Sequence, residues 1–210
     1  MFVSGAGFWQ YSLVLGMTSQ TFILASVSPR RVLLLKQIIP GFEVVPSAAS
    51  EVHDSNLTAW EMAQVNAYRK ARAVAKKFPD AIVLGADTLV YLDREARLFG
   101  KPANLAEAEQ MLGMLAGRAH AVITGVCLLH LRSHRQSVFA DWTDVRFHSL
   151  TETQIREYLA LISPLDKAGA YAIQEHGERI VAEISGSFSN VVGLPLERLR
   201  EELKLWQNVG

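Results

Sequence analysis

The chain has 210 residues, of which 50% are apolar and 20% are charged, and its 21 basic residues balance its 21 acidic ones. These values are typical of a globular domain and exclude disordered, collagen-like and coiled-coil chains. A net charge of zero provides no general attraction for nucleic acid or for an anionic membrane, so we expect neither as a partner.

The first half of the chain alternates apolar runs with signals for helix starts. Ser28 followed by Pro29 is a cap with a proline in the first turn, and Thr58 with Glu61 is a capping box for the longest expected helix. An almost wholly apolar run then predicts a buried strand. The expected elements are a strand at 22–25, a helix from 29 to about 39, an extended run at 42–45, a loop at 47–56, a helix from 58 to about 77 and a strand at 81–92.

The second half combines helices with a long hairpin. Asn104 is a helix cap, and Thr151 with Gln154 forms a second capping box. Interleaved strands and helices together with antiparallel pairing predict a mixed α/β or α+β fold. The expected elements are a turn at 93–98, a helix from 104 to 117, a hairpin with arms 119–131 and 136–147, a helix from 151, strands around Tyr171 and Ile180, a loop at 185–190 and a final helix from about Pro195.

The cysteine and the histidines give little indication of a catalytic or metal-binding role. Cys127 is the single cysteine and lies in an apolar run, so we expect a buried thiol and a reducing compartment. His130 and His134 flank the tip of the hairpin, where we expect solvated side chains rather than metal ligands. The first twenty residues hold no charge and no segment has the length of a membrane helix, which predicts a cytoplasmic protein.

Two cations occupy an unfavourable place at the start of the first helix. Arg30 and Arg31 follow the cap directly, where the helix dipole is positive and disfavours each cation by roughly 0.3 to 1 kcal/mol. Free backbone N–H groups and an arginine fork together suit a phosphate. The segment therefore indicates either an anion site or two arginines that point into water.

A carboxylate in an apolar strand is the second anomaly. Asp87 requires a metal, a cation or water as partner, or else belongs to a satisfied polar bridge with Thr88. Glu51, Lys70 and Lys101 offer further charges in other segments. If the fold brings these groups together, two carboxylates could hold Mg²⁺ or Mn²⁺ and four cations could hold a polyphosphate, as a metal-dependent nucleotide hydrolase requires.

Six short strings of residues, in register from about 22 to 203, carry a resemblance. They are the segments 24–31, 85–88, 100–102, 124–126, 164–171 and 192–196. Together they resemble the Maf family of nucleoside triphosphate pyrophosphatases. The resemblance implies an α/β fold similar to that of inosine triphosphate pyrophosphatases, with two lobes around a central cleft, and a homodimer. It covers one domain at 21–210, preceded by an extension of unknown role at 1–20.

The resemblance also implies a reaction, the hydrolysis of a nucleoside triphosphate to the monophosphate and pyrophosphate. Asp87 matches the proton acceptor that would activate water for attack on the α-phosphorus. Glu51 and Asp87 would hold a divalent metal cation, Mg²⁺ or Mn²⁺. The residues that would bind the triphosphate or the base are Ser26, Ser28, Arg30, Arg31, Lys70, Thr88, Lys101 and Gln174.

The segment 166–174 resembles the branch that hydrolyses dTTP and UTP. In that branch the residues matching Arg30, Thr88 and Gln174 are linked to substrate choice, and a glutamine offers both an acceptor and donors to a pyrimidine edge. Two alternatives are open. One is a pyrophosphatase for 7-methyl-GTP or for purine nucleotides, and the other is a nucleotide-responsive regulator of septum formation.

The chain departs from the pattern of the family at two places. Ser50 precedes Glu51 where the family often has a second carboxylate, which weakens the expected metal site. Ala172 and Glu175 stand where glycines commonly flank the Ile-Gln pair, so we expect a base pocket of different shape.

Overall fold

The structure, a computed structural model that describes residues 20–207, is built around one seven-stranded mixed sheet with the order β2-β1-β3-β5-β6-β7. β1 runs parallel to β2 and β3, and the other pairs are antiparallel, including β4 on β3. This confirms the predicted α/β fold with a mixed sheet. The strands are β1 (Phe22–Leu24), β2 (Glu43–Val44), β3 (Ile82–Leu92), β4 (Arg97–Phe99), β5 (Ala119–His130), β6 (Arg135–Phe147) and β7 (Val181–Ser185).

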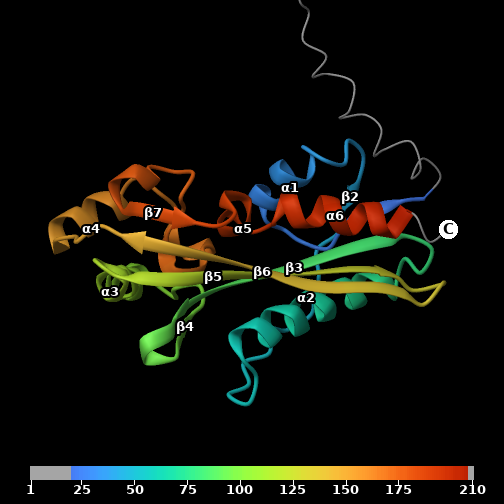
Figure 1. Cartoon of the computed structure of the whole chain (residues 1–210), viewed down its shortest axis with the longest axis horizontal. Helices are drawn as coiled ribbons and strands as arrows, with labels where there is room; N and C mark the ends of the chain where they lie inside the picture. The colour runs from blue at the N-terminus through green and yellow to red at the C-terminus, as the bar shows by residue number, and fades with distance from the viewer. Residues whose placement is uncertain (1–19, 208–210) are drawn as a thin grey trace, which may run out of the picture.

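Helices cover both faces of this sheet (Figure 1). α2 lies on one face, whereas α1, α5 and α6 lie on the other, and α3 and α4 gather at one end. The part of the chain that the structure describes contains no helix with the length and apolar character of a membrane span. The helices are α1 (Pro29–Leu35), α2 (Ala59–Ala75), α3 (Leu105–Leu115), α4 (Glu152–Leu159), α5 (Phe188–Val192) and α6 (Leu196–Gln207).

α2 packs unusually close to the sheet. Gly125 on β5 faces the backbone of α2 at Ala63, and Gly85 on β3 faces it at Ala67. A Cβ atom at either glycine would overlap these backbone carbonyls, so only glycine permits the contact. The helix contributes alanines here, and Ala63 and Ala67 are fully buried. The close contact fixes the side chains of α2 relative to β3 and β5.

One edge of β3 is interrupted at its centre. β5 pairs with β3 along residues 82–91 on one edge. On the other edge β1 pairs with residues 82–84 and β4 with residues 90–92. Among the described strands none pairs with this edge between these two stretches, where Asp87 and Thr88 lie. The sheet therefore opens at the two residues that the sequence singled out.

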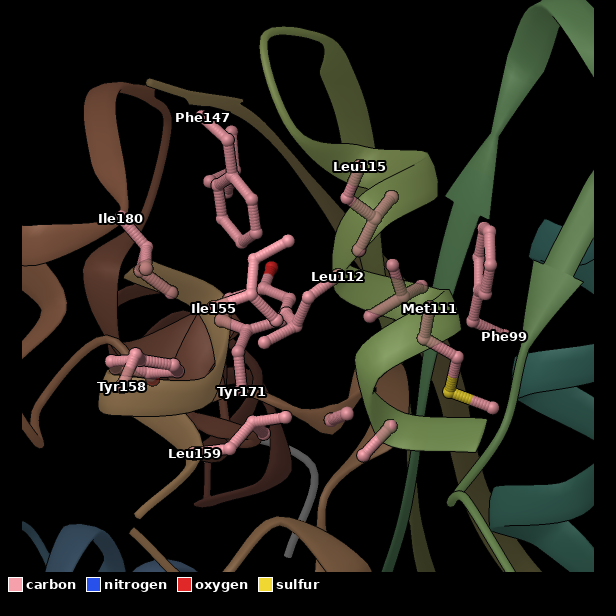
Figure 2. Close-up of a cluster of buried hydrophobic side chains, with 14 of the residues drawn as sticks. Phe99, Met111, Leu112, Leu115, Phe147, Ile155, Tyr158, Leu159, Tyr171 and Ile180 are labelled. Atoms are coloured by element: carbon pink, nitrogen blue, oxygen red, sulfur yellow. The ribbon is translucent and has the colours of Figure 1, made fainter. Parts of the chain in front are cut away.

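A separate hydrophobic cluster lies on each side of this opening. One contains Phe22, Leu35 and Trp206 and packs α1 and α6 on the sheet. The other lies among α3, α4 and the end of β6, where Figure 2 shows Phe147 and Tyr171 beside the helix α3. These clusters are the cores of two lobes that share the long strands.

His120 is buried in the second cluster. Its Nε2 atom lies 2.9 Å from the hydroxyl of Tyr171, while Nδ1 has no hydrogen-bond partner among the described residues. Burial lowers the pKa of His120 from 6.5 to about 4. The unfolded chain therefore binds a proton at a higher pH than the folded protein, and the free energy of unfolding falls as the pH drops from 6.5 toward 4.

We expect this histidine to contribute a loss of about 2 kcal/mol in the free energy of unfolding between pH 7 and pH 5. The contribution should be absent from His120→Phe and retained in His148→Asn, because His148 is exposed. Urea unfolding at several pH values measures the difference. Equal pH dependence of the wild type and His120→Phe would contradict it.

Most of the expected elements are present, but one expectation is wrong and two hold only in part. Tyr171 is not in a strand, because Gly169 and Ala170 before it have φ angles of 68° and 64°, which break an extended chain. The expected loop at 185–190 contains the start of α5, and the expected turn at 93–98 contains the start of β4. The strand expected around Ile180 begins one residue later, as β7.

The expectations for cysteine and histidine hold in part. Cys127 is fully buried in β5, and burial raises the pKa of its thiol to about 12. His134 is exposed as expected. His130 is buried instead, because its ring nitrogens lie 2.7 Å from the hydroxyl of Ser133 and 3.2 Å from the backbone oxygen of Asp80. Residues 1–19 of the expected N-terminal extension lie outside the described residues.

Candidate active site

The opening beside β3 leads into a cleft made of two adjoining hollows of about 170 and 260 Å³. Side chains of both lobes line it, together with the loop between β2 and α2. Every site residue predicted from the sequence lies on its wall. The first hollow is lined by Ser28, Arg30, Arg31, Glu51, Lys70, Asp87, Thr88, Lys101 and Gln174, and the second adds Ser26.

Two carboxylates face one ammonium group in this cleft. Lys70 on α2 lies 2.5 Å from Oδ1 of Asp87 and 2.7 Å from Oε1 of Glu51. Asp87 is only 3% exposed, so Lys70 compensates a charge that the strand could not bury alone. Partial burial acts to raise the pKa of Glu51, but the hydrogen bond from Lys70 and the charges of Lys70 and Lys101 outweigh it and lower this pKa.

The two arginines at the start of α1 are held by the protein rather than by water. Arg30 forms an ion pair of 2.8 Å with Asp166, which belongs to the opposite side of the cleft. Arg31 donates to the backbone oxygen of Gly193 at 2.8 Å and to the hydroxyl of Thr88 at 2.9 Å. Burial lowers the pKa of Arg31, although the charge of Asp87 opposes this effect. These contacts thus hold both guanidinium groups in fixed positions at the surface of the cleft.

The hydroxyl groups of the cleft belong to the same network. Ser28 accepts a hydrogen bond from the backbone of Arg31 and so caps α1, and Ser26 accepts one from the backbone of Ser28 at 3.2 Å. Thr88 lies 3.0 Å from the hydroxyl of Thr124 on β5. These contacts fix the start of α1 and the side chain of Thr88 against the sheet.

The far end of the cleft carries a second chain of polar contacts. Gln174 donates to Glu175 at 3.2 Å, and Glu175 lies 3.7 Å from the ammonium of Lys167. Lys167 is 4% exposed and donates to Asp166 at 2.9 Å. Asp166 in turn accepts a hydrogen bond from Arg30, so this chain of contacts connects Gln174 to the start of α1. Glu175, the residue expected to change the shape of the base pocket, accepts the hydrogen bond that Gln174 donates.

Lys101 differs from the other cations of the cleft. It lines both hollows, and within residues 20–207 it takes part in no ion pair. Its ammonium group is therefore available to a bound anion.

Sequence reasoning missed Asn66 and assigned no role to Lys167. Asn66 is 1% exposed and donates to Oδ2 of Asp87 at 3.2 Å. It lies one helical turn before Lys70, and this spacing of two polar residues on an otherwise apolar helix face was the available signal. Lys167 could not be found in this way, because its partners come from a segment with no regular period.

The two carboxylates suit a divalent cation. Glu51 and Asp87 are hard oxygen donors that converge on the point that the Lys70 ammonium contacts. Within the described residues no group of three or more His, Cys, Asp or Glu side chains is arranged to hold a metal ion. The chemistry of Glu51 and Asp87 as oxygen donors is that of Mg²⁺ sites, in which one or two carboxylates commonly bind the ion together with phosphate oxygens and water.

Two sequence comparisons with known proteins agree on one family. The sequence profile described as "Maf-like protein" matches residues 21–206. A dTTP/UTP pyrophosphatase of Symbiobacterium thermophilum is 49% identical over 180 residues, covering 85% of this chain and 90% of that protein. The dTTP/UTP pyrophosphatase of Halalkalibacterium halodurans is 46% identical and covers 87% and 94%. A HAM1 protein structure from Coxiella burnetii aligns with a TM-score of 0.48 at 13% identity, over 89% and 99% of the chains.

Proposed function

Because the chain belongs to the Maf-like protein family, we propose that it hydrolyses dTTP and UTP to the monophosphate and pyrophosphate. The observation that carries this proposal is the position of Asp87 in a cleft that five lysine and arginine side chains line. A buried acid beside several cations suits a reaction in which negative charge grows on phosphate oxygens.

Asp87 is the proposed proton acceptor. A water molecule would attack the α-phosphorus and give its proton to the carboxylate, while the bond between that phosphorus and the bridging oxygen breaks and pyrophosphate leaves. Lys70 contacts the same carboxylate, and its positive charge compensates the charge of this buried acid.

The cations of the cleft are the proposed triphosphate site. Arg30 and Arg31 provide guanidinium forks, and Lys70 and Lys101 provide point charges. Ser26 and Ser28 would add donors at the start of α1. These groups would stabilise the charge that develops on the phosphate oxygens. Glu51 and Asp87 would hold the divalent metal, which supplies further charge neutralisation when bound.

Gln174 and Thr88 are the proposed base-selecting residues, with Arg30. One hydrogen of the Gln174 amide is directed to Glu175, which leaves the amide oxygen as an acceptor. Uracil and thymine both present a ring N–H donor where cytosine presents an acceptor, so an acceptor in this place favours dTTP and UTP over CTP.

A nucleotide panel tests the proposal. Release of pyrophosphate would be measured for dTTP, UTP, CTP, GTP and 7-methyl-GTP, each with Mg²⁺ and with Mn²⁺. We expect dTTP and UTP to have the highest kcat/KM. Faster hydrolysis of GTP or 7-methyl-GTP would instead assign the chain to the purine alternatives.

Arg30→Ala should weaken nucleotide binding with little loss of stability. The ion pair of Arg30 with Asp166 is half-exposed and contributes at most about 1 kcal/mol to folding. We expect KM for dTTP to rise about tenfold, since one guanidinium contact to a phosphate is lost. Steady-state kinetics and thermal unfolding measure the two effects. A collapse of Tm without a change in KM would show that Arg30 serves the fold alone.

The assembly and location are also part of the proposal. We propose a homodimer in the cytoplasm, with residues 21–210 as one domain. The match of the family profile to 21–206 supports the domain boundaries, and the single, buried cysteine fits a reducing compartment. Analytical ultracentrifugation of the full chain tests the dimer.

A further inference from the structure

We propose that Asn66 is a positioning residue that holds the two carboxylates of the cleft in their relative places. The inference deepens the proposed function and rests on it. Asn66 lies on α2 and is 1% exposed. Its Oδ1 atom accepts a hydrogen bond of 2.7 Å from the backbone N–H of Val52. Its Nδ2 atom donates at 3.2 Å to the backbone oxygen of Val52 and at 3.2 Å to Oδ2 of Asp87.

The first two of these bonds fix the loop that carries Glu51. Asn66 pairs with both backbone groups of Val52, the residue next to Glu51, as a strand pairs with its neighbour. Between β2 and α2 the described chain contains no helix or strand, and among the described residues the hydrogen bonds and ion pairs that tie the centre of this loop to the rest of the protein come from α2. These are the bonds of Asn66, the bond of Arg69 to the backbone oxygen of Ser50 and the ion pair of Lys70.

The third bond fixes Asp87 itself. Lys70 contacts Oδ1 of this carboxylate and Asn66 contacts Oδ2, so each oxygen has a partner on α2 and rotation of the carboxylate is restricted. Asn66 is neutral, so it orients the carboxylate without adding a second charge beside it. One buried amide therefore links the proposed base to the loop that carries the second carboxylate, beside the bridge that Lys70 makes between the two carboxylates.

Two variants separate this role from a structural one. Asn66→Ala removes all three bonds. Asn66→Asp has the same volume and keeps an acceptor for the N–H of Val52, but it loses the donor to the backbone oxygen of Val52 and to Asp87 and places a carboxylate oxygen there instead. The matched control is His130→Ala, which also removes a buried polar side chain that ties two segments, at the Ile82 end of β3.

Three quantities are measured for each full-length variant, namely kcat and KM for UTP, Tm, and hydrogen exchange of the segment 47–57. We expect kcat to fall about 10- to 100-fold in both Asn66 variants, because the carboxylate is no longer oriented, with a much smaller change in KM. Exchange of the segment should rise in Asn66→Ala and less in Asn66→Asp. His130→Ala should lower Tm and leave kcat and the exchange of this segment unchanged.

Results that would contradict the positioning role of Asn66 differ from results that would contradict the pyrophosphatase activity. If both Asn66 variants keep the wild-type kcat while Tm falls, Asn66 is structural only. If exchange of the segment does not change in Asn66→Ala, Asn66 does not fix the loop. Should Asn66→Ala fail to fold, the isosteric Asn66→Asp decides through its kcat. A wild-type protein that releases no pyrophosphate from UTP or dTTP would contradict the proposed function instead.

Discussion

Asp87→Asn should lower kcat for dTTP about 10³-fold, because an amide cannot accept the proton of the attacking water. The fold should persist. Asparagine has the same shape, Lys70 retains Glu51 as a partner, and Asn66 can still donate to the amide oxygen. Pyrophosphate release measures kcat, and calorimetric titration with dTTP measures binding, which should change far less than the rate.

Asp166→Asn is the matched control for this prediction. It makes the same chemical change on the wall of the same cleft, where Asp166 holds Arg30 and Lys167. It should affect KM more than kcat. If Asp87→Asn keeps more than about a tenth of the wild-type kcat, the proton acceptor is another group. Loss of hydrolysis together with an intact effect on septum formation in cells would favour the regulatory alternative.

Gly125→Ala should lower the free energy of unfolding by about 3 kcal/mol or prevent folding altogether. The new methyl group would overlap the backbone of Ala63 on α2, and neither backbone can yield without losing hydrogen bonds. Because α2 also carries Asn66 and Lys70, any protein that folds should have a strongly reduced kcat. Urea unfolding and pyrophosphate release measure the two effects.

Gly113→Ala is the control for the glycine substitution. Gly113 lies on α3 with no atom within 4 Å of the position of a Cβ. We expect alanine at this position to raise the free energy of unfolding by about 0.5 to 1 kcal/mol, because its helix propensity is higher than that of glycine. Wild-type stability of Gly125→Ala would mean that the contact between α2 and the sheet has room for a side chain.

The sequence predicted the elements whose signals are local. Ser28, Thr58, Asn104 and Thr151 each cap the helix that follows, as expected, because a cap depends on residues only three positions apart. Tyr171 was wrongly expected in a strand. Its apolar neighbours resemble a strand, and the left-handed backbone at Ala170 depends on packing that no local pattern reveals.

The types of residue in the site could be predicted from the sequence, but the contacts between these residues could not. Asp87 was recognised because a carboxylate in an apolar strand requires compensation. Its partner Lys70 and the loop residue Glu51 were expected to serve a substrate or a metal, and the structure shows that they also contact each other. Arg30 and Asp166 are 136 residues apart in sequence, so only the folded chain reveals their ion pair.

The continuous strands beneath the cleft determine how it can receive a ligand. β3, β5 and β6 are 11, 12 and 13 residues long, and they run under both lobes without a break. Backbone ladders between them join the two lobes through one sheet. A nucleotide would thus bind between two lobes that share their strands, so the sheet itself would need no hinge motion and only the side chains and loops of the lining would be ordered at a cost to affinity.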